Sequence, residues 1–486
     1  MIQRKILSWL FIISFLAIIS CQQDNLNMTG EVKLQFSADT LSFDTIFTTI
    51  GSTTAWLKVK NPESHSVIIS RIFLAGSENS PFRLNINGVN NNEVQNVSIL
   101  SGDSIFIFVE VTVNPTGQNN PMVIQDSIVF EVNGNRQDVD LLAFGQDFHL
   151  FDGKTLKTQH WQNDKPYLIY NSILVDSLEK LTIDPGCRIY FHQGASLFVQ
   201  GTLNVQGTCK EPVTFMGDRL EKDYADTPGQ WGAWKLLENQ SKYIYGGIHF
   251  LKGSKDNLID HAVIKNASKG IQVDSMGFSS KPMLVLSNTI IENMTLNCLD
   301  ARTTSLKANN CIFANSGSYS VALLLGGNYE FYHCTIANYY NYRTSVRKEP
   351  SLVVNNYYTY DNKVYAYDLT KAYFANCIID GMMDNEIVLD PIMNAQFNYR
   401  FQNCLIKSNS SFYPKDQAFG SSVFNKNPLF TDSSKNDYSL DPLSPARNAG
   451  NKNIAIQFPT DLNEHSRLED EGPDVGALEW QSSNMK

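Results

Sequence analysis

The sequence has little of several features that mark whole classes of function. Only 18% of its 486 residues are charged and the net charge is −10, with no basic stripe, which argues against nucleic-acid binding. Its eight cysteines include no C-x-x-C pair, the close spacing that cysteine metal sites use. After the first 21 residues no apolar run reaches membrane-spanning length. What is abundant is Tyr, Phe and Asn, a composition typical of β structure with polar turns.

One six-residue pattern recurs through the second half of the chain. It begins at His261, Asn288, Asn310, His333, Asn376 and Asn403, with spacings of 27, 22, 23, 43 and 27 residues. Each copy predicts a short strand with a small residue second and a large apolar residue fourth. Strand side chains alternate between faces, so these two positions share one side, which we expect to be the core. A strand repeated every 20–30 residues or so predicts a stacked solenoid.

The other positions of the repeat also suggest structural roles. Four copies carry cysteine at the second position, where we expect small buried hydrophobes, not a metal site: Cys311, Cys334, Cys377 and Cys404. Asparagine at the first position predicts a ladder of side-chain amides, in which the rings of His261 and His333 replace an amide. Asp260 and His261 are expected to point to opposite faces of their strand.

Short strands separated by glycine-containing turns precede the repeat, and they resemble a known family. Leu181-Thr-Ile-Asp-Pro-Gly186 followed by Leu203-Asn-Val-Gln-Gly207 is similar to the opening coils of right-handed parallel β-helix proteins of the pectate-lyase-like kind. Asp474-Val-Gly-Ala-Leu-Glu479 resembles the closing segment of bacterial extracellular members. The resemblance implies a right-handed parallel β-helix over residues 149–486. Residues 430–480 lack the repeat and are expected to cap an exposed end of the solenoid.

Residues 32–148 have a different pattern of alternating strands separated by turns, which predicts a β-sandwich. The order of Phe43-Asp44-Thr45-Ile46, Val59-Lys60-Asn61 and Gly102-Asp103-Ser104 resembles ASH-type immunoglobulin-like domains. Such domains serve as spacers or protein-contact modules. The predicted fold class is therefore all-β, an immunoglobulin-like sandwich followed by a right-handed parallel β-helix.

The first residues form a targeting segment. Arg4 and Lys5 precede a short apolar run, and residues 1–20 predict a signal peptide. Ser20-Cys21 resembles the bacterial lipoprotein cleavage box, which implies lipidation of Cys21 and a tether over residues 21–31. No Asp directly follows the cysteine, so we expect a lipid-anchored outer-membrane protein. Gln22-Gln23-Asp24-Asn25 loosely resembles the polar, acidic export tag of Bacteroidota surface lipoproteins, which implies a position at the cell surface.

The best candidate for binding lies in the 43-residue gap of the repeat. Segment 329–373 holds 11 of the 21 tyrosines. Excess residues between coils become loops that project from one face, and Tyr and Arg suit a sugar or protein ligand. The alternative is one further coil with surface aromatic pairs. The predicted ligand-binding residues are Tyr339, Tyr340, Tyr342, Arg343, Arg347, Tyr357, Tyr358 and Tyr360. Residues 217–245 form a second departure from the regular coil.

Three functions stay open on the sequence. The first is a non-catalytic binding or assembly component for glycan or a partner outer-membrane protein, with no cofactor. The second is a polysaccharide lyase or glycoside hydrolase, with Ca²⁺ only in the lyase case. The Asp-Asp pair and Gly-His-Gly turn of β-helix pectin hydrolases are missing, and the acids and bases nearest to such a site are Asp300, Arg302, Asp380, Asp384 and Asp390. The third is a spacer, which buried tyrosines would support.

Overall fold

A computed structural model of the protein describes residues 32–117, 121–232, 234–236, 242–244, 246–274, 281–342, 347–469 and 471–482. The chain divides into two compact units, Met1–Asp147 and Phe148–Lys486. Within the described residues no helix is long and apolar enough to cross a membrane. Cys21 and Arg343 lie outside the described residues.

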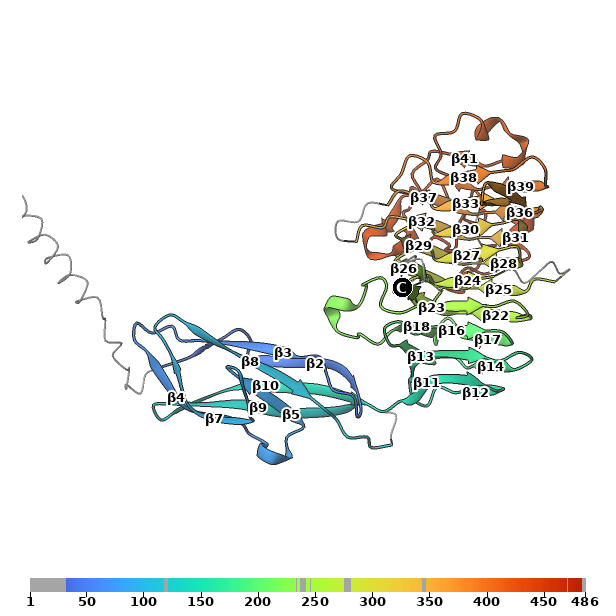
Figure 1. The fold of residues 1–486 in the computed structure, drawn as a ribbon. Coiled ribbons are helices and arrows are strands. Elements are labelled where there is room, and N and C mark those ends of the chain that lie inside the picture. The colour runs from blue at the N-terminus through green and yellow to red at the C-terminus, as the bar shows by residue number, and fades with distance from the viewer. Residues whose placement is uncertain are drawn as a thin grey trace, which may run out of the picture. The chain divides into compact units, whose positions relative to one another are not determined.

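The first unit is a sandwich of two five-stranded sheets (Figure 1). One sheet has the spatial order β1 (Gln35–Phe36), β3 (Ala55–Lys60), β8 (Ser104–Val111), β5 (Phe82–Ile86) and β6 (Val89–Asn90). The other has the order β2 (Thr40–Phe47), β10 (Asn135–Gln146), β9 (Met122–Val132), β4 (Val67–Leu74) and β7 (Glu93–Ile99), and η1 (Ser77–Asn79) follows β4. Alternate residues of the strands, such as Leu57 and Ile107, point into the core between the sheets. All pairs are antiparallel except β2–β10, as in an immunoglobulin-like domain.

The second unit is a parallel β-helix with three strands in each regular coil. Its first strands β11 (His149–Leu156) and β13 (Tyr167–Val175) bend across two faces. Face one then stacks β15 (Arg188–Phe191), β18 (Val213–Gly217), β23 (Ala262–Lys265), β26 (Ile290–Met294), β29 (Ile312–Ser316), β32 (Thr335–Asn338), β37 (Ile378–Gly381), β40 (Leu405–Ile406) and β41 (Val423–Phe424). Face two stacks β16 (Leu197–Val199), β21 (Ile248–Phe250), β24 (Ile271–Val273), β27 (Leu299–Arg302), β30 (Val321–Leu324), β33 (Leu352–Asn355) and β38 (Ile387–Asp390).

Face three closes each coil. It stacks β12 (Gln159–Trp161), β14 (Lys180–Ile183), β17 (Thr202–Gln206), β22 (Asn257–Asp260), β25 (Leu284–Ser287), β28 (Ser305–Asn309), β31 (Gly327–Tyr332), β36 (Leu369–Ala375) and β39 (Phe397–Gln402). Two additional hairpins, β19 (Trp234–Leu236) with β20 (Lys242–Ile244) and β34 (Tyr357–Tyr360) with β35 (Lys363–Ala366), are insertions, and η2 (Lys222–Tyr224) precedes the first.

The repeat predicted from the sequence forms face one in register. Ile291 pairs with Phe313, Phe313 with Ile336 and Ile336 with Ile379, so the fourth position stacks as an inward column. The four repeat cysteines are buried beside it as free thiols, as predicted. Burial raises the pKa of the Cys334 and Cys377 thiols well above the ordinary value, so they are inert, small core residues.

The first position of the repeat is a corner. All six copies have left-handed backbone, with φ between 47° and 54°, a conformation that asparagine tolerates better than most residues. The amide ladder forms in part: Asn310 donates to Asn288 at 3.0 Å, and Asn376 lies 2.9 Å from the His333 ring. The prediction for Asp260 and His261 is wrong. The left-handed turn at His261 breaks the alternation and brings its ring nitrogen 3.0 Å from the Asp260 carboxylate.

Stacked rings fill face three at the C-terminal end of the coil stack. Phe331, Phe374, Phe401 and Phe419 lie one above another with centroids 4.7–4.8 Å apart, the distance between neighbouring strands. Phe419 belongs to η4 (Gln417–Phe419), which follows η3 (Tyr413–Lys415) and lies across the last coil.

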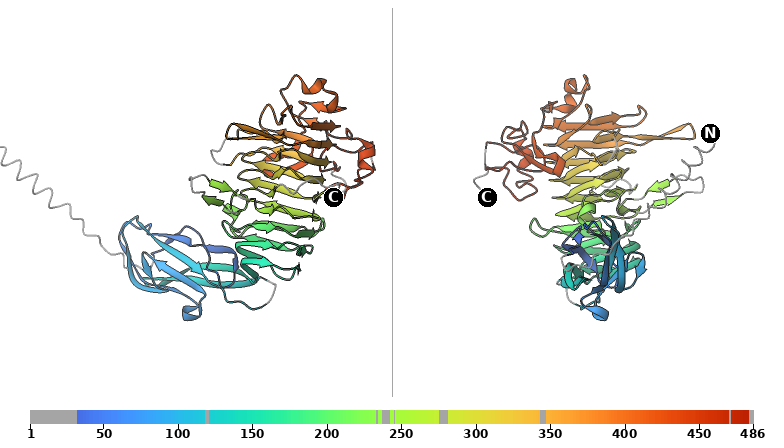
Figure 2. Two further views of the ribbon diagram at one scale, coloured as in Figure 1. Left: turned by 45° about the vertical axis from the view of Figure 1, so that its right-hand side comes forward. Right: turned by 90° about the vertical axis from the view of Figure 1, so that its left-hand side faces the viewer.

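The C-terminal segment does not cap an end of the solenoid, which corrects the prediction for residues 430–480. It contains β42 (Phe430–Asp432), η5 (Ser433–Lys435), β43 (Asp437–Leu440) and α2 (Lys452–Ala455), and it lies along the side of the stack (Figure 2). Tyr438 and Leu478 cover Ala314 and Ala337 on the outer side of face one. The reason is that the outer side of face one also carries apolar residues, Ile312, Ala314, Ala337 and Ile378, and these need a cover.

One buried arginine fastens this segment. Arg467 is fully buried, forms an ion pair with Glu479, and donates to the Asn310 side chain at 3.0 Å and to the Ala477 carbonyl at 3.2 Å. The segment is thereby tied to the corner ladder.

We predict that Phe374→Ala destabilises the protein by about 3–5 kcal/mol, because it removes the central ring of the stack and leaves a cavity. Chemical denaturation followed by circular dichroism measures the effect. Phe412→Ala is the control, since this ring is 61% exposed, and it should change stability by less than about 0.5 kcal/mol. Equal effects of the two changes would contradict the stacked core.

Candidate functional site

A groove on the outer side of face one brings together the two irregular segments of the solenoid. We call it the tyrosine groove. Its volume is about 770 Å³, and it is lined by Asp226, Pro228, Glu292, Asn293, Asn315, Tyr339, Tyr340, Asn341, Tyr342, Met382 and residues 433–436. Asp226 belongs to the irregular segment 217–245. The tyrosines belong to the 43-residue gap in the repeat, more than 100 residues later in the chain. The Tyr342 hydroxyl lies 3.5 Å from Thr227, which links the two segments.

Asparagines at the ends of the face-one strands hold the tyrosines in the groove. The amide oxygen of Asn315 accepts from the Tyr339 backbone N–H at 3.1 Å, and that of Asn338 accepts from Tyr340 at 3.3 Å. Asn338 also donates to the Ser316 and Ser318 carbonyls, at 3.0 and 2.9 Å. The chain therefore leaves β32 along a fixed path, since Asn338 and Tyr339 are both bonded to the preceding coil and Asn338 in turn holds the Tyr340 backbone.

The three tyrosines of the groove have different roles. The Tyr339 hydroxyl donates to Asp380 at 2.8 Å, and its ring packs edge-on against Phe430. This residue therefore helps to fasten the C-terminal segment. Tyr340 is largely buried and Tyr342 is half-buried, with ring centroids 6.5 Å apart. Tyr340 and Tyr342 are the other two aromatic side chains that line the groove.

Charged side chains flank the groove in one outward column of face one. Strand register places Lys265, Glu292, Ala314, Ala337 and Asp380 one above another. Glu292 and Asp380 are three inter-strand steps apart, about 14 Å, which is too far to span one sugar bond. The C-terminal segment covers the two alanines, so an acid remains at each side of it.

Burial shifts the protonation of both acids. Burial raises the pKa of Glu292 to about 7; Lys265 lowers it and Asp226 raises it further. Burial also raises the pKa of Asp380, and the hydrogen bond from Tyr339 opposes that shift. Lys265 is 3.6 Å from the Asp226 carboxylate. Glu292 is consequently a carboxyl group that changes charge near neutral pH beside a second carboxylate.

A smaller cleft of about 440 Å³ adjoins the groove through Tyr339 and Ser433. Asp380, Lys407, Asn425 and Phe430 also line it. The Lys407 ammonium donates to the Gly381 carbonyl at 2.6 Å. Together the two hollows present tyrosine rings, amides and carboxyl groups, the side chains that bind the hydroxyls and apolar faces of sugars.

The structure assigns Arg347 to the core, not to a ligand. Its guanidinium forms a two-pronged ion pair with Glu386, at 2.9 and 2.5 Å, and donates to the Asn338 carbonyl at 3.0 Å. Glu386 is fully buried and also accepts from the Ser351 N–H and hydroxyl. The pair closes the loop between β32 and β33.

The remaining predicted tyrosines lie on a separate projection, the β34–β35 hairpin (Figure 2). Tyr358 stacks on Tyr365 with centroids 4.9 Å apart, and Tyr360 is 70% exposed. The Tyr357 hydroxyl donates to Asp390 at 3.0 Å. The repeat gap is therefore neither an extra coil nor one continuous loop. It is one coil with two insertions, at residues 339–351 and 356–368, on either side of β33.

The acids considered for catalysis are mostly in structural contacts. Asp300 is buried between Lys269 at 2.6 Å and Arg302 at 2.9 Å, and despite its burial these two cations lower its pKa. Asp390 accepts a hydrogen bond from the Tyr357 hydroxyl, and Asp384 is exposed. The buried His249 ring lies 2.8 Å from the Asp274 carboxylate. In the part of the chain that the structure describes, no three His, Cys, Asp or Glu side chains gather in a way that could hold a metal ion.

Comparisons with known proteins agree with the fold. Residues 168–336 match the family model described as right handed beta helix region. The second unit is a right-handed parallel β-helix. The predicted fold class is thereby confirmed. A comparison with curated proteins finds no match.

The similar solved structures are distant. A GH87 alpha-1,3-glucanase catalytic unit from Streptomyces thermodiastaticus is 7% identical over 73% of this chain and 64% of its own, with a TM-score of 0.24. A family 123 glycoside hydrolase from Clostridium perfringens is 8% identical over 27% of this chain and 30% of its own, with a TM-score of 0.19. The ASH/PapD-like domain 7 of human CEP192 is 12% identical over 26% of this chain and 95% of its own, with a TM-score of 0.17. The chain spans less than two thirds of either hydrolase, and scores this low carry no argument about function.

Sequence reasoning missed Asp226, Glu292 and Asn436 as groove residues. Glu292 is the fifth residue of its repeat copy, where two later copies have alanine, and that difference was the available signal. Asn436 donates to the Asn293 amide at 3.3 Å across 143 residues, a separation that no local pattern encodes.

We predict that Arg347→Met destabilises the protein by about 3–5 kcal/mol, because it leaves the buried Glu386 carboxylate without a cation. Adding Glu386→Gln to that variant removes the buried charge and should recover part of the loss. Denaturation midpoints of the two variants measure this coupling. A stable Arg347→Met protein that has lost ligand binding would instead restore the original assignment of Arg347.

Proposed function

We propose that this chain is a non-catalytic glycan-binding protein whose ligand occupies the tyrosine groove. The observation that supports it most is the composition of this hollow: Tyr340 and Tyr342 lie among the amides of Asn293, Asn315 and Asn341. A sugar ring has an apolar C–H face and a rim of hydroxyls, so an aromatic ring and several amides together match both parts of it.

The geometry of the groove also favours binding at a fixed site. The tyrosine segment is hydrogen-bonded to the coil through Asn315 and Asn338, and Arg347 is held by its ion pair with Glu386. A preorganised aromatic surface loses little entropy when a ligand binds. The spacer hypothesis is supported by the buried Tyr340 and the half-buried Tyr339, but it gives no reason for a hollow of this size beside them.

The proposal includes export and anchoring through lipid on Cys21, with the protein at the outer-membrane surface. A lipidated cysteine would place the groove where extracellular polysaccharide is available. A partner outer-membrane protein, if one exists, would have the exposed rings of the β34–β35 hairpin as a contact surface. The native protein can be purified in mild detergent and analysed by mass spectrometry. This measurement detects whether its N-terminal peptide is acylated and whether a partner protein is present in stoichiometric amount.

We predict that Tyr342→Ala and Tyr340→Ala each weaken glycan binding by up to about tenfold, because each removes one aromatic contact. The probe is the best-binding member of a panel of soluble neutral and acidic polysaccharides, with affinity measured by calorimetry. Tyr360→Ala on the hairpin is the matched control and should bind as the unchanged protein does. Unchanged affinity in both groove variants would refute this site.

A second candidate function, glycoside hydrolysis, is favoured by one observation. Glu292 and Asp226 line the same groove, and a carboxyl with a raised pKa beside another carboxylate is the arrangement of a general acid with a second acid. If the protein cleaves glycan, cleavage should fall as the pH rises through about 7, because Glu292 then loses the proton that it would donate.

Chromatography of the polysaccharide panel after incubation with the protein decides between binding and cleavage. Glu292→Gln keeps the shape of the side chain and cannot donate an acidic proton, so it would abolish hydrolysis and retain binding. If the polysaccharide stays intact at every pH, hydrolysis is refuted and binding is the only one of the two proposed functions that remains.

A further inference from the structure

The outer face of one sandwich sheet carries aromatic side chains in solvent. Trp56 on β3 is 55% exposed, and Phe106 and Phe108 on β8 are 41% and 43% exposed. The solvent side of an antiparallel sheet is ordinarily polar, so large exposed rings on this side are unusual. The Trp56 and Phe106 rings meet edge to face with centroids 5.8 Å apart, which restricts their motion.

Strand register arranges two of these rings and two amides in one line. Trp56 is opposite Phe108, Phe108 is opposite Asn85, and Asn85 is opposite Asn90. The line crosses β3, β8, β5 and β6 at right angles to the strands, and its three inter-strand steps give a length of about 14 Å. We call it the cross-strand row. None of its four members is charged.

The amide end of the row is held in place by hydrogen bonds. The Asn85 amide donates to the Asn90 side-chain oxygen, and the Asn85 oxygen accepts from the Gly88 backbone N–H at 2.9 Å. These contacts fix the orientation of both amides before any ligand arrives. The aromatic end and the amide end therefore form one preorganised surface.

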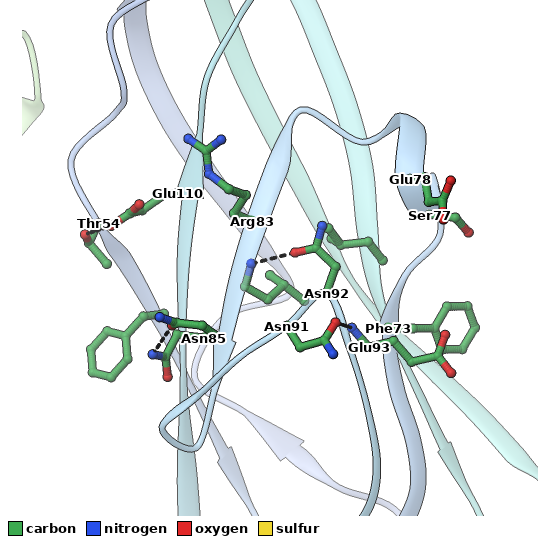
Figure 3. A pocket seen from close by; sticks show the side chains of 14 residues that line it. Thr54, Phe73, Ser77, Glu78, Arg83, Asn85, Asn91, Asn92, Glu93 and Glu110 are labelled. Carbon is green, nitrogen blue, oxygen red and sulfur yellow. Dashed lines mark hydrogen bonds between the residues drawn. The ribbon is translucent and has the colours of Figure 1, made fainter.

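A hollow of about 870 Å³ adjoins the row (Figure 3). Phe108, Asn85 and Asn90 form part of its wall, and Thr54, Arg83 and Glu110 lie along the next line of the same sheet. The Thr54 hydroxyl donates to Glu110 at 2.7 Å, and Arg83 donates to the Thr112 hydroxyl at 2.5 Å. These polar groups are directed at one another across the sheet, so the row itself offers rings and amides to a ligand.

We propose that the cross-strand row is a second glycan-binding site, which takes a neutral oligosaccharide laid across the four strands. The two rings match the apolar faces of consecutive sugars, and the two amides match their hydroxyls. The lack of charge in the row selects a neutral chain. The edge strands β1 and β6 have two residues each, which gives an added peptide strand little to pair with. The site shares a ligand class with the proposed function but is built from entirely different residues.

The test uses the full chain and an array of neutral oligosaccharides of α- and β-linked hexoses. Trp56→Ala and Phe108→Ala should each weaken binding of the best array member by about tenfold, because each removes one stacked ring. Trp56→Phe retains a ring and should recover most of the affinity. Val123→Ala is the matched control, since Val123 is 61% exposed on the other sheet and should have no effect. Equal thermal midpoints show that all variants are folded.

The outcomes separate this site from the tyrosine groove. Loss of binding to the array in Trp56→Ala with binding kept in Tyr342→Ala supports the cross-strand row, and the groove is then judged on the polysaccharide panel alone. The reverse result overturns the row and leaves the proposed function standing. No binding of any neutral oligosaccharide by the unchanged protein overturns the row, as does a dimer that Trp56→Ala dissociates, which would assign the face to a second copy of the chain.

Discussion

In-register stacking of the coils is the constraint on which the rest of the solenoid depends. Every coil buries one side of its strands only because the neighbouring coil places a matching residue directly above it. The inward column through Phe313, Ile336 and Ile379 satisfies this on face one, and the phenylalanine stack satisfies it on face three. The asparagine corners follow from the same constraint, because each coil must turn at the same place with the same left-handed backbone. Once the inward positions are fixed, the outward positions are free to differ from coil to coil, and those differences create the groove.

The tyrosine groove results from how the outer side of face one is covered. Alanine at positions 314 and 337 lets Tyr438 and Leu478 approach the sheet closely, and Arg467 secures the segment that carries them. Glu292 is then placed beside the edge of that cover. Its burial, together with the neighbouring Asp226 carboxylate, raises its pKa to about 7, so stacking leaves this outward position free to carry an acid that changes charge near neutral pH. The two proposed functions, binding and cleavage, therefore rest on one arrangement, and they differ in whether the two carboxyl groups reach a sugar bond.

The sequence predicted the parts of this structure that repeat. The small-then-large apolar alternation identified the inward columns, and the four cysteines were correctly placed as packing residues. The lateral position of the C-terminal segment was not predicted, although the string Cys311-Ile-Phe-Ala314 is apolar at every position and so indicates a strand buried on both sides. The candidate site was predicted only in part. Tyr340 and Tyr342 line the groove, but Arg347 is a core residue, because its partner Glu386 lies 39 positions away and only the fold brings them together. The cross-strand row of the sandwich was not predicted, because its four members come from four separate strands.

Hydrogen–deuterium exchange of the full chain, with and without a saturating amount of the best-binding polysaccharide, tests the account most directly. We predict slower exchange in peptides that cover residues 339–342 and 432–436, because a ligand in the tyrosine groove would contact both walls. Unchanged exchange at both walls, with protection elsewhere on the solenoid, would contradict it.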